Sequence, residues 1–343
     1  MNDAEALATR YLHEAVKKQY ATQVSGLLST LNGIDVNVRD GYGMTALMWA
    51  AGRGYSEIAS ILLRKGADVE ARNELLSVRS IETLETGKDT FLWVNDDRLG
   101  ALHAKKHHGW TVLIWAARNG RSDLVSLLLD AGADVNAITK DGFTALVHSI
   151  DNGHQETARL LLERGANPNL AEDGCSPALA IAAGLGFIGL VQEILNRGGI
   201  INRVDNWGHT ALENSVANNQ PDVLRLLLGY GLDANILGRD DINIPPLHIA
   251  AVQDALECAQ ILLDHGAHID AKDELNGATA LMFALDQMSG PRVARLLIER
   301  GADIRGALGR VEYFRGSAEG DEIAEAEEMI ELLKNHAEDG AGS

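Results

Sequence analysis

Apolar and polar residues follow one another along this chain in a pattern that repeats in steps of 33 to 35 residues. One marker of the pattern is a leucine that begins a run of apolar residues, and it recurs as Leu47, Leu113, Leu146, Leu179, Leu212, Leu247 and Leu281. A second marker is a glycine that follows a pair of aliphatic residues, and it recurs as Gly66, Gly132, Gly165, Gly198, Gly231, Gly266 and Gly301. The step from Leu47 to Leu113 is 66 residues, a double period. A fixed period of this length predicts a solenoid whose units each contact only their neighbours.

Each repeat predicts two short helices joined by tight turns. In the repeat at residues 141–165, Asp141 and Gly142 suit a tight turn, and Thr144 stands where its hydroxyl can cap the first helix. The second helix is predicted over residues 155–164, and Gly165 follows it as a left-handed C-terminal residue. Neither helix is long enough to be stable alone in water, so stacked neighbours must bury their apolar faces.

The repeated text resembles the ankyrin repeat family. The matching stretches are Thr-Ala-Leu-Met-Trp-Ala-Ala at 45–51, Pro-Leu-His-Ile-Ala-Ala at 246–251, and the endings Gly-Ala-Asp-Val-Asn at 132–136 and Gly-Ala-Asp-Val-Glu at 66–70. The resemblance covers residues 5 to 335 and implies an all-α solenoid, in which ankyrin repeats stack and carry β-turns at the tips of finger loops.

On this basis we expect one continuous stack with a cap at each end. Its parts are an N-terminal capping repeat (1–40), a first repeat (41–72), an insertion or enlarged finger loop (73–108), repeats two to seven (109–304), a C-terminal capping repeat (305–336) and a disordered tail (337–343). The C-terminal cap is expected to form its helix over Asp321 to Asn335, with a wet, glutamate-rich outer face.

The double step hides residues 73–108, which lack both markers. They form either a decayed repeat or an enlarged finger loop. We favour the loop because residues 90–94, Thr-Phe-Leu-Trp-Val, are typical of a β-strand. With the alternating segment and turn at residues 80–89, this run predicts a β-hairpin. Phe91 and Trp93 then either pack against neighbouring repeats or contact a partner, since solenoid insertions map to loops.

The same segment contains two histidines, His103 and His107, at a spacing that places both on one face of a helix. No third ligand is specified nearby, and the adjacent lysines repel a cation. We therefore expect a small basic patch here and no metal site.

In the family that the chain resembles, partners usually contact the finger tips and the exposed face of the first helix. Carried over by register, the resemblance implies a binding surface that consists of Tyr42, Met44, Arg53, His108, Trp110, Arg118, Asn119, Lys140, Phe143, Asp151, Asn152, Trp207, His209, Asn218, Gln253, Asp286 and Gln287. Aromatic residues at successive tips suit binding hot spots, and packing between fingers is the alternative for each. Trp49 and Trp115 lie within the first-helix motif and are predicted to be core residues. Replacing Trp110 by alanine is expected to weaken partner binding by about 2 kcal/mol or more while leaving stability little changed.

Composition narrows the function. The chain has 343 residues and a formal net charge of −19, so it lacks the basic footprint of a general nucleic-acid binder. Its two cysteines, Cys175 and Cys258, lie in different repeats and indicate reduced, structural residues of an intracellular protein. The N-terminal residues do not resemble a secretory or transit signal, and no apolar run is long enough to span a bilayer. We expect a location in the cytoplasm, with the nucleus as the alternative.

We therefore predict a non-catalytic, monomeric scaffold, adaptor or regulator that binds a protein partner through its concave finger and helix surface. No cofactor, metal, nucleic acid, membrane or small-molecule substrate is expected. An alternative is an acidic inhibitor or immunity-type protein that covers a basic surface of an enzyme, because residues 319–339 hold nine Asp or Glu against one Lys. Catalysis is disfavoured, since the glycine-rich stretch at 184–189 lies between two predicted helices and not after a strand.

Overall fold

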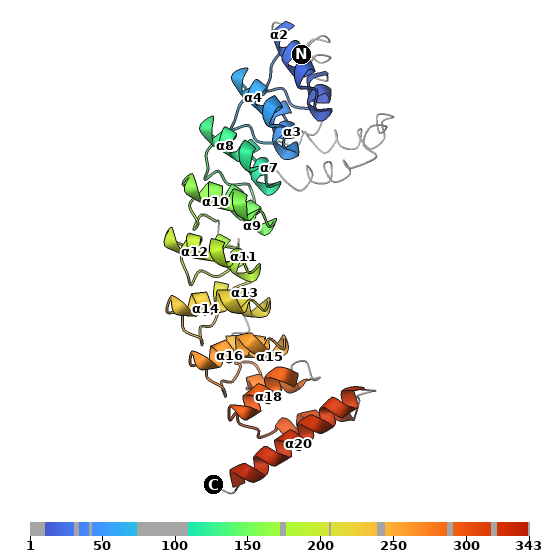
Figure 1. The fold of residues 1–343 in the computed structure, drawn as a ribbon, viewed down its shortest axis with the longest axis vertical. Coiled ribbons are helices and arrows are strands. Elements are labelled where there is room, and N and C mark those ends of the chain that lie inside the picture. The colour runs from blue at the N-terminus through green and yellow to red at the C-terminus, as the bar shows by residue number, and fades with distance from the viewer. Residues whose placement is uncertain are drawn as a thin grey trace. The chain divides into compact units, whose positions relative to one another are not determined.

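The structure is a computed structural model of the chain (Figure 1). It describes residues 11–30, 34–40, 43–73, 109–171, 176–205, 207–238, 244–286, 291–316 and 321–341. The chain divides into two compact units, Met1–Cys175 and Ser176–Ser343. The regular structure of the described residues is helical and contains no sheet, as predicted for an ankyrin repeat stack. None of the described helices is long and apolar enough to cross a membrane.

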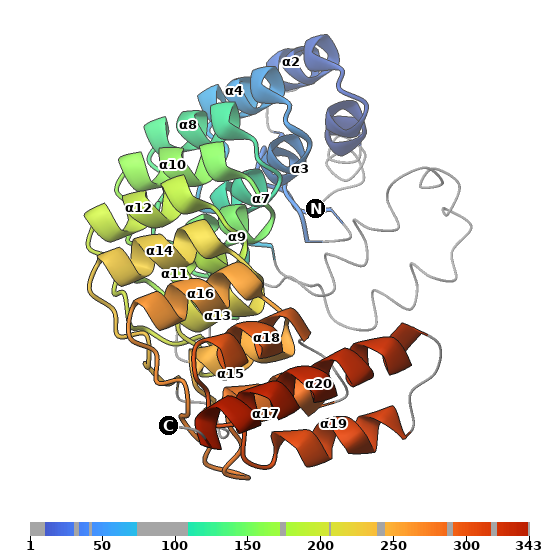
Figure 2. The same cartoon turned by 60° about the horizontal axis from the view of Figure 1, so that its bottom comes forward.

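In the first unit the helices form two layers (Figures 1 and 2). The first helix of each repeat lies in the first layer, which consists of α3 (Ala46–Arg53), α7 (Val112–Arg118) and α9 (Ala145–Asp151). The second layer consists of α2 (Ala21–Thr30), α4 (Ser56–Arg64), α8 (Ser122–Asp130) and α10 (Gln155–Glu163), and residues 11–17 form a helix that precedes it. Each helix contacts its successor in the same layer, so every repeat buries its apolar side against the next.

The second unit has the same two layers (Figure 2). Its first layer consists of α11 (Ala178–Gly184), α13 (Ala211–Ala217), α15 (Pro246–Val252), α17 (Ala280–Leu285) and α19 (Ala307–Arg315). Its second layer consists of α12 (Ile188–Asn196), α14 (Pro221–Gly229), α16 (Leu256–Asp264), α18 (Pro291–Glu299) and α20 (Asp321–Ala341). As in the first unit, neighbouring helices within a layer are in contact.

The C-terminal helix is longer than the sequence predicts. Helix α20 buries Met329, Ile330 and Leu333, and it packs against α18 and α19. It continues past Asn335 to Ala341, so the helix includes residues 337–341, which the sequence analysis assigned to the tail. The alanines and the glutamate of this stretch are strong helix formers, and they continue a helix that packing has already nucleated.

A threonine cap begins five of the described first-layer helices, whereas α11 and α15 follow a proline and α19 follows a glycine. The Thr144 hydroxyl accepts a hydrogen bond from the backbone N–H of Val147 at 3.2 Å, and equivalent bonds cap α3, α7, α13 and α17. At the other end of the repeat, Gly165 has a φ of +91°, the left-handed conformation that the sequence predicts. Local chemistry therefore fixes where each helix begins and ends.

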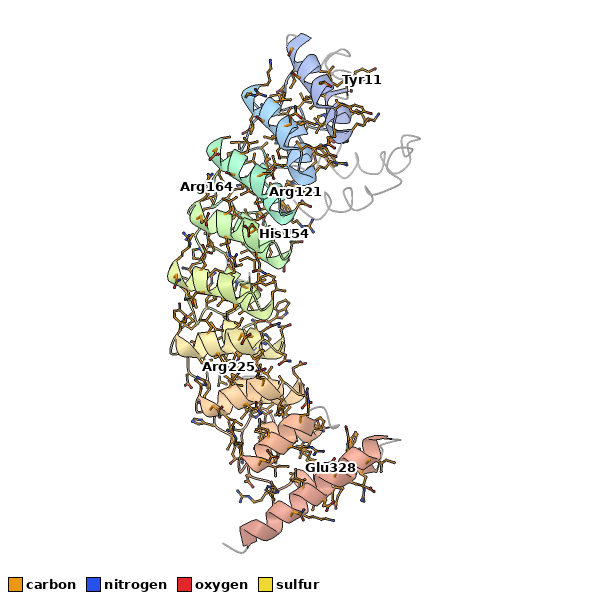
Figure 3. The ribbon with its side chains drawn as sticks, in the orientation of Figure 1. Tyr11, Arg121, His154, Arg164, Arg225 and Glu328 are labelled. Carbon is orange, nitrogen blue, oxygen red and sulfur yellow. The ribbon has the colours of Figure 1, made fainter. Side chains whose placement is uncertain are left out.

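In two repeats of the first unit, the next repeat closely approaches the glycine of the turn between the two helices. A Cβ atom on Gly54 would lie 2.9 Å from Nε of Arg121, and one on Gly120 would lie 2.6 Å from Nδ1 of His154 (Figure 3). Both glycines also have positive φ. The glycines in the sequence of these two turns are therefore explained by packing between repeats.

Ion pairs connect successive helices of the second layer. Arg164 lies 2.8 Å from Asp130, Arg225 lies 2.7 Å from Glu257, and Arg295 pairs with Glu328 at 2.5 Å (Figure 3). Exposed pairs of this kind each contribute less than about 1 kcal/mol. Arg164, Arg225 and Arg295 therefore already have carboxylate partners within the chain.

The finger loops precede the first-layer helices, and each is closed by hydrogen bonds at its base. Short fingers are bridged between Arg39 and Thr45, between Ile138 and Thr144, and between Lys272 and Thr279. The same bridge joins Arg72 to Thr111, although residues 74–108 lie between them.

The described residues on either side of residues 74–108 are held together like the two ends of a short finger, and we call this junction the base of the long finger. The backbone N–H of Asn73 donates to the Trp110 carbonyl at 3.1 Å, and that of Gly109 donates to the Asn73 carbonyl at 3.0 Å. Helices α3 and α7 contact each other directly, as do α4 and α8. The repeats on either side of residues 74–108 are therefore neighbours in the stack. The predicted hairpin and the pair His103 and His107 lie outside the described residues.

Candidate protein-binding surface

The finger loops and the first-layer helices form one surface of each unit, which we call the finger face. On the finger face of the first unit, the ring of Trp110 lies 5.0 Å from that of Trp115 and 4.3 Å from that of His148, between centroids. The guanidinium of Arg118 lies 5.5 Å from the ring centroid of Trp110. The ring centroids of Phe143 and His148 lie 5.6 Å apart. These residues make a continuous aromatic cluster that spans two repeats.

This cluster corrects the prediction that Trp110 is an exposed anchor, because its side chain is only 1% exposed. Trp110 directly precedes Thr111, the N-cap of α7, and Trp115 is the fourth residue of that helix. An apolar residue before the cap packs on the fourth helical residue in a hydrophobic staple. Met44 precedes the cap of α3 in the same way and is also buried, which corrects its predicted exposure.

Trp49 and Trp115 are buried, as predicted. The indole N–H of Trp49 donates to Oδ2 of Asp40 at 2.8 Å, and the same carboxylate oxygen lies 3.3 Å from Nζ of Lys17. Lys17 and Arg53 both lie over the Trp49 ring, at 4.6 Å and 5.4 Å from its centroid. The aromatic core of this unit is therefore covered by cations on the finger face.

Trp207, on a finger of the second unit, has the opposite character. Its side chain is 67% exposed. The turn beneath it is rigid, because Oδ1 of Asp205 accepts the backbone N–H groups of Trp207 at 2.8 Å and His209 at 2.9 Å. Asn214 on α13 holds the other oxygen of Asp205 at 2.9 Å. A hydrogen-bonded finger turn thus presents a large aromatic ring to solvent.

A family model described as ankyrin repeats in three copies matches residues 3–74, 90–172 and 236–306, which is more than half of the chain. The chain belongs to the ankyrin repeat family. The human ankyrin repeat and SOCS box protein 6 is 39% identical over 142 residues, which cover 39% of this chain and 33% of that protein. The human ankyrin repeat and SOCS box protein 16 is 33% identical over 170 residues, which cover 38% of this chain and 37% of that protein. The chain therefore matches only about a third of the length of these curated relatives.

A more distant relative and a solved structure agree with the ankyrin repeat assignment. The chicken nuclear factor NF-kappa-B p105 subunit is 26% identical over 116 residues, or 34% of this chain and 12% of that protein. The ankyrin repeat domain of human ASB11 superposes with a TM-score of 0.58 at 22% identity, over 76% of this chain and 99% of that chain. At this identity the structure supports the ankyrin fold, and the family assignment supports a protein-interaction module.

The ankyrin register brings the predicted binding residues to the finger face, but it exposes them unequally. The exposed residues are Lys140, Asp151, Asn152, Trp207, Asn218, Gln253 and Asp286. The half-buried residues are Arg53, Arg118, Asn119, Phe143 and His209. Outside the described residues lie Tyr42, Phe91, Trp93, His108 and Gln287.

Sequence reasoning missed two exposed apolar residues on ankyrin fingers that follow Trp207. Leu237 and Leu275 are both exposed. Val252, which ends helix α15, is exposed as well. The sequence analysis chose finger residues mainly for their aromatic side chains and so did not include these three. A leucine in a finger turn was a usable signal, because turn residues are usually polar. Within the described part of the chain, no group of three or more His, Cys, Asp or Glu is placed to hold a metal ion.

Proposed function

We propose that this chain is a binding module that holds a protein partner on its finger face, with Trp207 as a central anchor. The observation that carries this proposal is the exposure of a tryptophan on a finger whose backbone is fixed by Asp205. Tryptophan is the residue type most enriched at binding hot spots. A rigid aromatic side chain loses little conformational freedom when a partner covers it, so more of its buried area contributes to affinity.

The neighbouring fingers of the second unit support the same surface. Leu237 and Leu275 add exposed apolar area on the fingers that follow, and Gln253 and Asn218 add exposed amides at the ends of first-layer helices. Apolar anchors with a polar surround are the usual anatomy of a protein-binding surface.

The test is affinity capture with mass spectrometry, using the full chain and its Trp207→Ala variant as baits. A matched control is Ile188→Ala, which removes an exposed apolar side chain from the second layer of the same unit. At least one partner should fall about tenfold or more in recovery with Trp207→Ala and stay unchanged with Ile188→Ala, as expected for a hot spot of about 2 kcal/mol. Full recovery of every partner by Trp207→Ala would show that the proposal is wrong.

A further inference from the structure

The described residues on the finger face of the first unit include a cluster of cations, in contrast to the chain as a whole with its net charge of −19. Arg39, Arg72, Arg118 and Lys140 all lie on its fingers or on α7, and within the described residues none of them forms an ion pair. Arg39 donates to the Gly43 carbonyl at 3.1 Å and also to the Arg72 carbonyl. Since carbonyl oxygens are neutral acceptors, the positive charge of these side chains is not cancelled.

Three of these cations converge on the base of the finger at Gly109 and Trp110. Arg72 donates to the carbonyls of Gly109 at 2.9 Å and Ile138 at 2.7 Å. The aliphatic part of Lys140 packs on Gly109, where an added Cβ would lie only 3.0 Å from Cγ of Lys140. The guanidinium of Arg118 approaches the same place from α7, over the ring of Trp110.

Arg118 differs from Arg39 and Arg72 because no hydrogen-bond acceptor for its guanidinium lies among the described residues. It is half-buried, and burial lowers the pKa of its guanidinium, with the nearby carboxylate of Asp151 acting in the opposite direction. Arginine nevertheless keeps its charge in proteins. A guanidinium that has lost water and has no hydrogen-bond acceptor among the described residues gains from a carboxylate, which can bind it with two parallel hydrogen bonds.

The opposing charges on these elements are few. The described carboxylates of these fingers and first-layer helices are Asp40, which contacts Lys17 and Trp49, together with Asp141 and Asp151. In the second layer, by contrast, Arg164 is already paired with a carboxylate of the preceding repeat.

We propose that the finger face of the first unit binds an acidic segment of the partner, whose Asp or Glu side chains are held by Arg118, Lys140 and Arg72. This inference rests on the proposed function and names the chemistry of the partner. Phe143 is half-buried on the same finger as Lys140, so a segment that mixes carboxylates with apolar residues fits this face best.

The test is a selection from a displayed library of random peptides with the full chain as bait, followed by fluorescence anisotropy with the enriched peptides. The variants are Arg118→Ala/Lys140→Ala and Lys140→Glu, the second of which inverts the charge and keeps the Cβ and Cγ methylenes of an exposed side chain. The matched control is Arg64→Ala/Lys65→Ala, which removes one arginine and one lysine from the exposed C-terminal end of α4 in the same unit.

Enriched peptides should carry net negative charge, and their dissociation constants should rise about tenfold or more with either variant and stay unchanged with the control. Changing their Asp and Glu to Asn and Gln should have a similar effect, and binding should weaken as NaCl rises from about 0.1 M to about 0.5 M. Neutral or basic peptides, or acidic peptides that ignore both variants, would overturn the inference. If such peptides still require Trp207, the proposed function survives. If no peptide is enriched, the inference is contradicted, and the capture experiment with Trp207→Ala decides the proposed function separately.

Discussion

Replacing Trp110 by alanine should destabilise the first unit strongly. The side chain is 1% exposed and packs against Trp115, His148 and Arg118. A buried tryptophan removes roughly 200 Å² of surface from water, and at about 25 cal/mol per Å² this corresponds to about 5 kcal/mol. Alanine retains part of this area, and the neighbours relax partly into the space. We therefore expect a loss of about 3–5 kcal/mol in the free energy of unfolding.

Urea denaturation followed by far-UV circular dichroism measures this loss, and Trp207→Ala is the matched control. Because Trp207 is 67% exposed, its removal should change the free energy of unfolding by no more than about 0.5 kcal/mol. The first transition should move to lower urea only in Trp110→Ala, since repeat stacks can unfold in parts. Similar small shifts in both variants would refute the reasoning and return Trp110 to the set of exposed anchors.

Two further outcomes follow from buried titratable groups. Burial raises the pKa of the Cys258 thiol to about 11. In a Cys175→Ser variant, whose one remaining thiol is Cys258, the folded protein should resist a thiol reagent at pH about 8 and react after denaturation. Rapid reaction of the folded protein would contradict the buried environment of Cys258. Burial also lowers the pKa of His248 from its ordinary 6.5, although Nε2 contacts the Ala278 carbonyl at 3.0 Å. The unfolded chain then binds more protons than the folded chain just below that value, so stability should fall as the pH drops below about 6.5. His248→Gln should reduce this fall in urea titrations at two pH values, and an unchanged pH dependence would exclude His248 as its source.

The repeat register, the threonine caps and the left-handed glycines could all be predicted, because each depends on residues close together in sequence. The exposure of finger residues could not, because it depends on what the next repeat places over them. Trp110 and Trp207 occupy similar finger positions in the sequence. In the structure His148 of the following repeat covers Trp110, whereas Trp207 is exposed to solvent. The five-residue spacing of Trp110 and Trp115 was a usable signal for the staple.

The cationic cluster also escaped the sequence analysis, for a different reason. Net charge is summed over the whole chain, and acidic residues in many other places outweigh these few cations in that sum. Arg72, Arg118 and Lys140 are separated by tens of residues and meet only because the ends of the long finger close at Asn73 and Gly109.

The closure of that finger at Asn73 and Gly109 makes the stack insensitive to how many residues lie between them. Each doubling of a flexible connection costs only about 0.6 kcal/mol in closure entropy, while the contacts of α3 with α7 stay the same. Residues 74–108 can therefore vary in length and sequence without a matching change in the repeats. This junction is a natural position for grafting a foreign domain or a reporter, and it allows the connecting segment to evolve on a separate course from the scaffold that carries it.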